Sequence, residues 1–424
     1  MLKAISRYGA RVIPNTQQLA ADLQRRGQLV LGPHIARFEH AVACRLGVDE
    51  VVTTSYGRMA FHYLLTSLNL PPGSEAIFPS LTFWVVPEIA RVSGVTPVFA
   101  DVDPTTFTLS PRAFEQAITE RTRVVVPTHL WGLPCDMDPI LDIAARHSIT
   151  VIEDCAHALG ATYRGRQVGT LGDAAFFSFQ TLKPLNTYGG GMALARSPAV
   201  ASRVRVLAEL EPWPDEKEVR WNLFRGRVQR ISTRPNTFTW TLFPVGWIAS
   251  YLGIDASAYL WERVRPLDPL PQEYRRRYTN VQAAIGLEGL AHLDAWIART
   301  RAHAARMDRA LGGIPGVTTP AVPPDHTHVY YQYCVYVPDR DLLTRECIRR
   351  GVDVETLHVD VCTQLALFGP SRSAPGAEQG AQAVQLPVYE SLTDDQVVRV
   401  ARVVAESLAT RAPTHAPQIP QSQP

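Results

Sequence analysis

Val151-Ile152-Glu153-Asp154-Cys155-Ala156-His157 is the stretch that decides the fold, because an apolar run there ends abruptly in acids and a histidine. Short apolar runs of this kind form buried strands, and we predict one over residues 149–152. In open α/β sheets, ligands bind beyond the carboxyl ends of the strands. Asp154 and His157 directly follow the predicted strand, so we expect chemistry at this point of the sheet.

The surrounding sequence alternates short β-rich runs with stretches of helical length. This alternation predicts an α/β fold with a mostly parallel central sheet and helices on both faces. A second, smaller α/β domain is predicted toward the C-terminus. The predicted strands are residues 51–54, 76–78, 97–100, 124–127, 149–152 and 329–337, and the predicted helices are residues 59–68, 84–92, 111–118, 139–147, 281–311, 341–350 and 396–408.

A serine and a lysine downstream complete the pattern. Phe177-Ser178-Phe179 is followed by Lys183, in a polar loop that leads into Gly189-Gly190-Gly191. An acid, a hydroxyl and a lysine in this order suit pyridoxal phosphate, which binds a lysine through its aldehyde, a carboxylate through its pyridine nitrogen and donors through its phosphate. Once released by substrate, Lys183 is also the natural base to move a proton. The structural alternatives are a helix cap for Asp154, a backbone-bonded Ser178 and a solvated Lys183.

Two other strand ends carry candidate cofactor contacts. Ser55-Tyr56-Gly57-Arg58 opens a helix, and helix N-termini bind anions. We therefore predict Gly57 and Arg58 near the phosphate, with an ordinary turn and a surface arginine as the alternative. Phe83 would stack on a pyridine ring or pack in the core. His157 would contact the ring hydroxyl of the cofactor, hold Asp154 in place, or serve only the structure.

Composition excludes several other classes of protein. The 424 residues, 46% hydrophobic and 19% charged, indicate a soluble globular enzyme of two or three domains. A net charge of +2 gives no reason to expect nucleic acid as a partner. The six cysteines form no CxxC pair, so we expect no metal site. We expect reduced thiols and a cytoplasmic location. The N-terminus lacks the apolar core of a signal peptide.

From about residue 31 to residue 408, the chain resembles the nucleotide-sugar aminotransferases of the DegT/DnrJ/StrS type. The resemblance rests on Pro79-Ser80-Leu81-Thr82-Phe83, residues 97–103, Pro127-Thr128-His129-Leu130-Trp131-Gly132, Glu153-Asp154-Cys155-Ala156-His157-Ala158, Gly169-Thr170-Leu171-Gly172-Asp173, Phe177-Ser178-Phe179, Lys183 and Gln282-Ala283-Ala284-Ile285-Gly286-Leu287. It implies the PLP-dependent transferase type I fold and a homodimer with sites at the subunit interface. It also implies transfer of an amino group from glutamate to a nucleotide-linked keto-sugar.

For the site, the resemblance implies pyridoxal 5'-phosphate on Lys183, with Asp154 at the pyridine nitrogen and Ser178 at the phosphate. It also implies Phe83 on the face of the ring and His157 near the ring hydroxyl. In one branch of the family a histidine replaces the lysine and the enzymes dehydrate instead. Lys183 argues against that branch.

The chain departs from the family pattern around the phosphate. The family's Ser-Gly-Thr turn is Tyr56-Gly57-Arg58 here, and its Gly-Glu-Gly-Gly after the lysine is Tyr188-Gly189-Gly190-Gly191, without the glutamate. The asparagine that the family offers across the dimer aligns with Arg275. We expect Arg58 and Arg275 to take over phosphate binding from smaller donors.

Domain limits are predicted as residues 1–200 for the cofactor domain, 201–275 for an atypical insertion, 276–410 for a helix with the small domain, and 411–424 for a disordered tail. In the insertion, arginines lead into the uncharged run 237–253, which Pro244 and Gly246 interrupt. We do not expect it to span a membrane. Basic residues beside Trp and Phe are typical of membrane interfaces, so we predict a peripheral membrane contact or a hydrophobic substrate channel. Packing on the dimer partner is the alternative.

The leading hypothesis is a pyridoxal-phosphate aminotransferase that acts on a keto-sugar in polysaccharide, glycoconjugate or secondary-metabolite biosynthesis. Two alternatives stay open at this point. One is a non-catalytic relative that serves in regulation or assembly, and the other is cofactor chemistry on a non-sugar or lipid-linked carbonyl compound.

Overall fold

The computed structural model of the chain describes residues 3–9, 13–252, 262–356 and 359–409. Its centre is a seven-stranded sheet of order β1-β10-β9-β6-β5-β2-β4. Only β10 runs antiparallel to its neighbours, so the predicted mostly parallel sheet is confirmed. The strands are β1 (Val52–Thr54), β2 (Glu75–Pro79), β4 (Thr96–Ala100), β5 (Thr122–Val125), β6 (Thr150–Asp154), β9 (Ala174–Ser178) and β10 (Gly191–Ala195).

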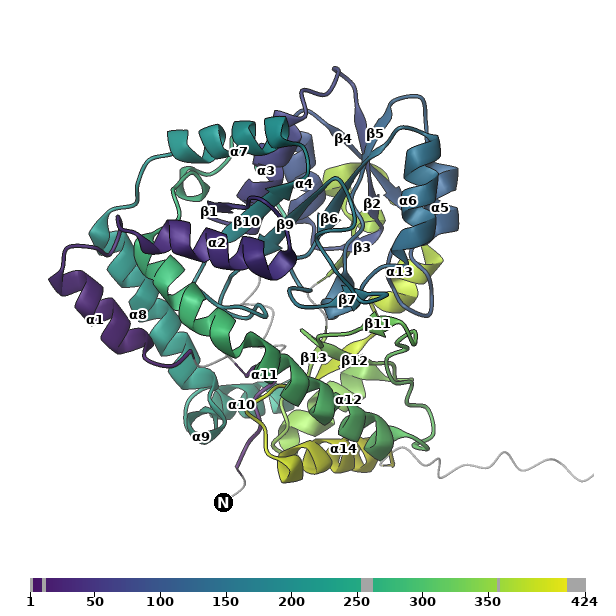
Figure 1. Cartoon of the computed structure of the whole chain (residues 1–424). Helices are drawn as coiled ribbons and strands as arrows, with labels where there is room; N and C mark the ends of the chain where they lie inside the picture. Colours follow the sequence, from purple (N-terminus) through teal and green to yellow (C-terminus); the bar gives the residue numbers. More distant parts are fainter. Residues whose placement is uncertain (1–2, 10–12, 253–261, 357–358, 410–424) are drawn as a thin grey trace, which may run out of the picture.

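Helices cover both faces of this sheet, as predicted (Figure 1). One buried core includes Phe38, Phe114 and Ile140, and a second includes Met59 and Ile89. Two separate apolar cores are what a sheet buried on both faces requires. The helices of the first face are α2 (His34–Leu46), α5 (Pro111–Ala117) and α6 (Met137–Arg146), and those of the second are α3 (Gly57–Ser67), α4 (Val85–Val92) and α7 (Pro198–Leu210).

The alternation of strands and helices does not predict β9 and β10. No helix separates these two strands, and the loop of residues 179–190 that joins them contains Lys183. An antiparallel return needs no crossover helix, so the helical signal that marks the other strands is missing here. The lysine therefore lies in a strand-to-strand loop at the carboxyl end of β9.

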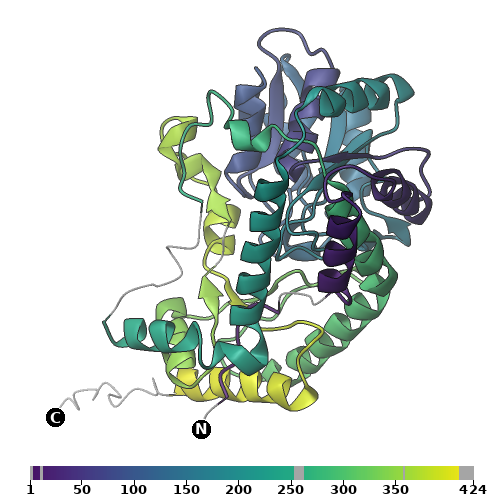
Figure 2. The same ribbon diagram turned by 90° about the vertical axis from the view of Figure 1, so that its left-hand side faces the viewer.

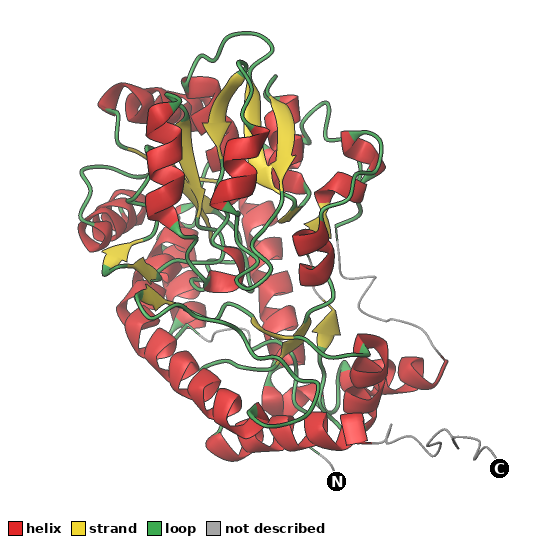
Figure 3. Ribbon diagram, turned by 90° about the vertical axis from the view of Figure 1, so that its right-hand side faces the viewer, coloured by secondary structure: helices red, strands yellow, loops and turns green. Residues whose placement is uncertain are grey.

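The smaller C-terminal α/β unit is built on the long helix α11 (Asn280–Leu311) and a sheet of order β12-β15-β13. Figure 3 shows the strands of the central sheet gathered above this unit. The three predicted helices of this region are confirmed to within a turn. The unit contains β12 (Tyr333–Val335), β13 (Glu355–Thr356), β15 (Val384–Leu386), α12 (Arg340–Arg349) and α14 (Asp394–Ala409).

The strand predicted at residues 329–337 is shorter in the structure, where β12 pairs with β15 and Tyr336 forms a bridge to Thr318. The N–H groups of Val329 and Gln332 donate instead to the carbonyls of Gly132 and Trp131. These bonds hold residues 329–332 against the central domain.

The remaining elements are α1 (Thr16–Arg25), β3 (Leu81–Thr82), β7 (Thr162–Tyr163), β8 (Arg166–Gln167), β11 (His326–Thr327), β14 (Asp360–Val361), α13 (Pro375–Gly380), η1 (Leu130–Gly132), η3 (Gln272–Tyr274), η4 (Cys362–Gln364) and η5 (Ala366–Phe368).

The predicted insertion, in which the sequence shows no regular pattern, is largely helical where it is described. After α7 come α8 (Glu216–Thr233), α9 (Pro235–Phe238) and α10 (Phe243–Leu252). Of all the helices in the described ranges, none is both long enough and apolar enough to cross a membrane. Gly253, at the end of the uncharged run, and the predicted tail 411–424 lie outside the described residues. The domain limits stay a prediction.

Candidate active site

Asp154 is the last residue of β6 and is buried at the carboxyl edge of the sheet. Its backbone N–H donates to the Pro127 carbonyl, and one carboxylate oxygen accepts the Ala156 N–H at 3.0 Å. Burial raises the pKa of the Asp154 carboxyl, whereas the Ala156 N–H and the Lys183 charge lower it. The carboxylate is therefore fixed in position and lies within electrostatic range of the lysine.

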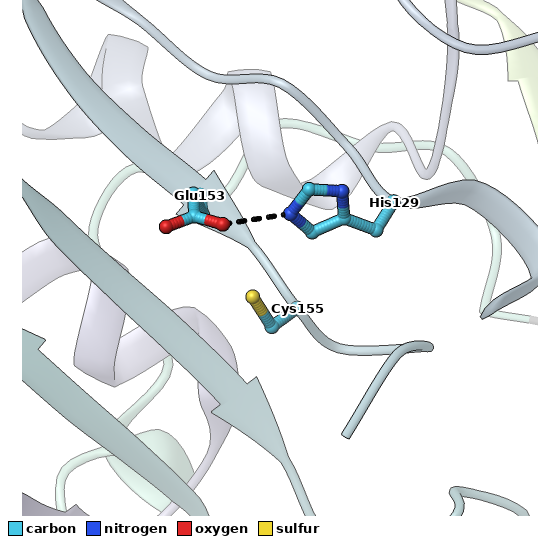
Figure 4. A group of neighbouring side chains, drawn as sticks. All are labelled: His129, Glu153 and Cys155. Carbon is cyan, nitrogen blue, oxygen red and sulfur yellow. Dashed lines mark hydrogen bonds and ion pairs between the residues drawn. The ribbon is translucent and has the colours of Figure 1, made fainter. Parts of the chain in front are cut away.

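Glu153, which precedes Asp154 in the chain, forms a buried pair with His129 (Figure 4). One Glu153 oxygen lies 3.0 Å from His129 Nε2 and also accepts the Gly169 N–H, and the other accepts the N–H groups of Leu171 and Gly172. The Cys135 N–H donates to His129 Nδ1 at 3.0 Å, so Nδ1 acts as an acceptor and the proton that faces Glu153 is on Nε2.

The side chains of His129, Glu153 and Cys155 lie close enough to one another to hold a metal ion. However, both nitrogens of His129 and both oxygens of Glu153 already have hydrogen-bond partners. A metal ion would have to displace these bonds, because buried polar groups are costly to leave unpaired. We interpret the cluster as structural support for Asp154.

Lys183 lies in the loop between β9 and β10, with its ammonium 4.6 Å from the centre of the Tyr331 ring. Burial lowers the pKa of Lys183 to about 8; Asp154 opposes this decrease and Arg58 adds to it. The loop then turns through Gly190, whose φ of 109° is left-handed. A Cβ there would meet the Tyr278 ring at 2.2 Å, so only glycine fits at this position of the loop.

His157 lies beside the same tyrosine, its ring stacked on Tyr331 with centroids 4.4 Å apart. Burial and the Lys183 charge hold the pKa of His157 well below its usual value. Its buried Nδ1 has no hydrogen-bond partner within the described part of the chain. Tyr331, which the sequence assigned to a strand, thus joins His157 to Lys183.

The start of α3 lies directly against the end of β9. A Cβ on Gly57 would meet the Phe177 carbonyl oxygen at 2.9 Å and the Ser178 Cβ at 3.1 Å. The helix begins without a capping side chain. The Met59 N–H donates to the Tyr56 carbonyl, and the start of the helix next to Ser178 is a place where an anion can bind. The structure thus brings Gly57 and Ser178 together, as the sequence predicts for a phosphate site.

Arg58 is held by a carboxylate that the sequence analysis did not identify. Its two terminal nitrogens lie 3.0 and 2.9 Å from the Glu262 oxygens, and it donates to the Tyr274 hydroxyl at 2.6 Å. Its guanidinium also lies 5.9 Å from the centre of the Phe83 ring. Arg58 and Phe83 are therefore neighbours, but a phosphate would have to share Arg58 with Glu262.

Arg275 is placed differently. Its Nε lies 3.1 Å from Glu211, and more than half of its side chain is exposed. Among the described residues, no contact joins it to Asp154, Ser178 or Lys183. Within one chain, Arg275 is thus apart from the other predicted site residues, and its phosphate contact stays a prediction that requires a second subunit.

Comparison with known proteins agrees with this geometry. Residues 12–231 and 253–405 match the DegT/DnrJ/EryC1/StrS aminotransferase family. The chain belongs to this family. It is 32% identical to the GDP-perosamine synthase of Caulobacter vibrioides, covering 87% of this chain and 89% of that enzyme. It is also 32% identical to the dTDP-3-amino-3,4,6-trideoxy-alpha-D-glucose transaminase of Streptomyces venezuelae, covering 92% and 91%.

Among solved structures, DesV of S. venezuelae in complex with a ketimine intermediate superposes with a TM-score of 0.73 at 31% identity, covering 92% of this chain and 94% of that one. The predicted type I fold of pyridoxal-phosphate enzymes is thereby confirmed. The protein is a pyridoxal-phosphate-dependent aminotransferase of the DegT/DnrJ/EryC1/StrS family.

The polar groups of this aminotransferase fit its cofactor. His157 Nδ1 is buried without a partner, Asp154 is a buried carboxylate at a strand end, and α3 begins uncapped. Groups of this kind are suited to a ring hydroxyl, a pyridinium nitrogen and a phosphate respectively.

Tyr188 occupies the loop position where the family has the first glycine of Gly-Glu-Gly-Gly, and it has a left-handed φ of 59°. Its hydroxyl accepts a hydrogen bond from Arg230 of α8 at 3.1 Å. A Cβ on Gly226 would lie 2.1 Å from the nearest carbon of the Tyr188 ring. The lysine loop is therefore braced by the insertion. The sequence analysis did not identify this contact.

Proposed function

We propose that this aminotransferase moves an amino group from glutamate to a keto-sugar carried on a nucleotide. The names of two relatives support the substrate class, since one is a GDP-perosamine synthase and the other makes a dTDP-linked amino sugar. The observation that carries the proposal is the meeting of Lys183, Asp154 and His157 at one edge of the sheet. Polysaccharide, glycoconjugate or secondary-metabolite synthesis is the corresponding setting.

Each residue has a distinct role in this proposal. Pyridoxal phosphate, bound through its aldehyde to Lys183, supplies an electron sink for the bond broken at the substrate α-carbon. Asp154 holds a proton on the pyridine nitrogen. The Lys183 amine, released by substrate, moves the proton between the α-carbon and C4′. A pKa near 8 leaves part of this amine unprotonated at neutral pH.

The other residues bind and orient the cofactor. Ser178 and the N–H groups at Gly57 hold the phosphate, and Phe83 covers the ring. His157 is neutral, because burial lowers its pKa, so its Nδ1 serves as a hydrogen-bond partner for the ring hydroxyl rather than as a charge. Arg58 and Arg275 contribute positive charge at the phosphate, Arg275 from the partner subunit of a homodimer.

The proposed setting is the cytoplasm, with a peripheral membrane contact through residues 237–253. Exposed Trp and Leu side chains in this segment support the contact. Residue 253 itself lies outside the described residues.

Transfer of ¹⁵N from labelled glutamate tests the function. We expect label in the product when the acceptor is a nucleotide-linked keto-sugar, and much less with the same sugar lacking the nucleotide. Label transferred only to a non-sugar carbonyl compound, or to no acceptor in a broad nucleotide-sugar set, would contradict the proposal.

A further inference from the structure

Helix α8 carries an apolar stripe that no described element covers. Trp221, Phe224, Val228 and Ile231 are all exposed, and the Trp221 side chain leaves 58% of its area to solvent. Their spacing places them along one side of the helix. The residues that α8 buries, Val219, Gly226, Arg230 and Thr233, lie on the opposite side. Figure 2 shows α8 on the outside of the molecule, with α9 and α10 at its lower end.

Helix α10 continues the apolar surface and contains no charged residue. Only Ala249 is buried, whereas Val245, Ile248 and Leu252 are exposed along one side, Leu252 to 67%. The connection to α8 is fixed, since the Thr241 hydroxyl donates to the Ser232 carbonyl at 2.7 Å. We name these exposed side chains of α8 and α10 the α8–α10 surface.

The charge around this surface is mainly positive. Between Glu218 and Leu252 the sequence has no Asp or Glu but five arginines. Arg230 is buried on the opposite side of α8, and the other four are Arg220, Arg225, Arg227 and Arg234. Arg349 of α12 adds a further guanidinium, 4.3 Å from the Tyr251 ring. The acid nearest to it in α12, Glu346, already pairs with Arg349 and Arg350. The surface is thus apolar at its centre and basic at its edge.

The family comparison separates much of this surface from what family members share. The matched residues end at 231 and resume at 253, so the gap contains all of α9 and α10. Helix α10 therefore lies outside the residues that match the family, whereas the α8 stripe lies within them. A subunit contact shared by the whole family does not explain α10.

We propose that the α8–α10 surface docks on an anionic phospholipid membrane. Aromatic and aliphatic side chains beside arginines are the composition of segments that lie in a bilayer interface, and juxtaposed basic residues are attracted to anionic headgroups. A second copy of the chain fits less well, because a two-fold contact would bring the same basic patch of both subunits together, and the stretch between Glu218 and Leu252 offers no acidic residue to pair with its arginines. The inference rests on the membrane contact proposed above and extends it to α8 and to lipid charge.

Vesicle co-sedimentation of the full-length enzyme with its cofactor tests the proposal. One arm uses phosphatidylcholine vesicles and the other phosphatidylcholine mixed with phosphatidylglycerol. We expect binding to the mixed vesicles that weakens as salt is raised, and at least about tenfold weaker binding to phosphatidylcholine alone.

Three variants distinguish lipid binding through the α8–α10 surface from non-specific binding to vesicles. Val245→Glu with Ile248→Glu on α10, and Arg220→Glu with Arg227→Glu on α8, should each weaken binding at least about tenfold. Val206→Glu on α7 is the matched control, because Val206 is as exposed as Ile248, at 57% and 54%. The control should bind like the unaltered enzyme.

The absorbance of the bound cofactor, measured on the same samples, should be unchanged in all three variants. Loss of amino transfer with lipid binding intact would refute only the proposed reaction. Equal lipid binding by all proteins would overturn the docking proposal. So would a change of oligomeric state in the α8 or α10 variant, detected by light scattering, because it would identify a second copy as the occupant.

Discussion

The carboxyl edge of the central sheet and the α8–α10 surface are both incomplete within one chain, but in opposite chemical senses. At the sheet edge the unsatisfied groups are polar, such as His157 Nδ1 and the uncapped start of α3. On the α8–α10 surface they are apolar, such as Trp221 and Leu252. A polar small molecule completes the first region, whereas the second requires an apolar layer. Tyr188 joins the two regions through Arg230.

The sheet edge is most directly broken by replacing its lysine. Lys183→Ala should lower amino transfer by at least about 10³-fold, because both the cofactor attachment and the proton-moving amine are lost. The steady-state rate with glutamate measures this. The other lysines of the chain are Lys3 and Lys217, and Lys217→Ala, at the exposed start of α8, is the control. A comparable loss of activity in Lys217→Ala would contradict the assignment of Lys183 as the lysine that binds the cofactor.

The rigid support of the sheet edge should matter more for stability than Asp154 itself. Glu153→Gln places an amide among the N–H groups of Gly169, Leu171 and Gly172 and should destabilise the fold by about 3 kcal/mol. Asp154→Asn, one residue on, should change stability by less than about 1 kcal/mol while lowering activity. Urea unfolding of both variants without cofactor measures the two free energies of unfolding. A larger loss of stability in Asp154→Asn than in Glu153→Gln would contradict the supporting role of Glu153.

The link between the two regions is tested by a pair of helical glycines. Gly226→Ala pushes a methyl group into the Tyr188 ring and should cost about 1–3 kcal/mol and weaken retention of the cofactor on dialysis. Gly246→Ala meets only Ile348, at 3.7 Å, and should stabilise α10 by about 0.5–1 kcal/mol. If both variants retain the cofactor equally, the lysine loop does not depend on α8.

The smallest expected effect is on pH dependence. The unprotonated Lys183 amine attacks the cofactor aldehyde. The rate at which cofactor attaches to the cofactor-free enzyme should therefore rise with pH, with the midpoint of the rise near pH 8. Asp154→Asn should move this midpoint down, because the Asp154 charge holds the proton on Lys183. Stopped-flow absorbance across the pH range measures both midpoints. A midpoint above 10, as for a solvated lysine, would show that the amine is not buried.

The sequence was most informative where local chemistry and fold agree. Asp154 after an apolar run and Gly57 at a helix start both lie where their patterns predicted, because strand ends and helix starts are local features. Tyr331, Glu262 and Glu211 could not be found in this way. Each meets its partner through the tertiary fold, as Glu262 meets Arg58 from 204 positions away. Helix α8 was missed because arginines are interspersed among its apolar residues and Val219 lies on the side opposite Trp221, which weakens the apolar periodicity.

The central claim is that Lys183 holds the cofactor and that the cofactor takes an amino group there. Its most direct test is the absorbance spectrum of the purified enzyme, recorded before and after addition of glutamate. We predict a visible band that is bleached by glutamate and restored by a keto acid, and that is absent from Lys183→Ala. A band that persists in Lys183→Ala, or that glutamate leaves unchanged in the unaltered enzyme, would contradict the claim.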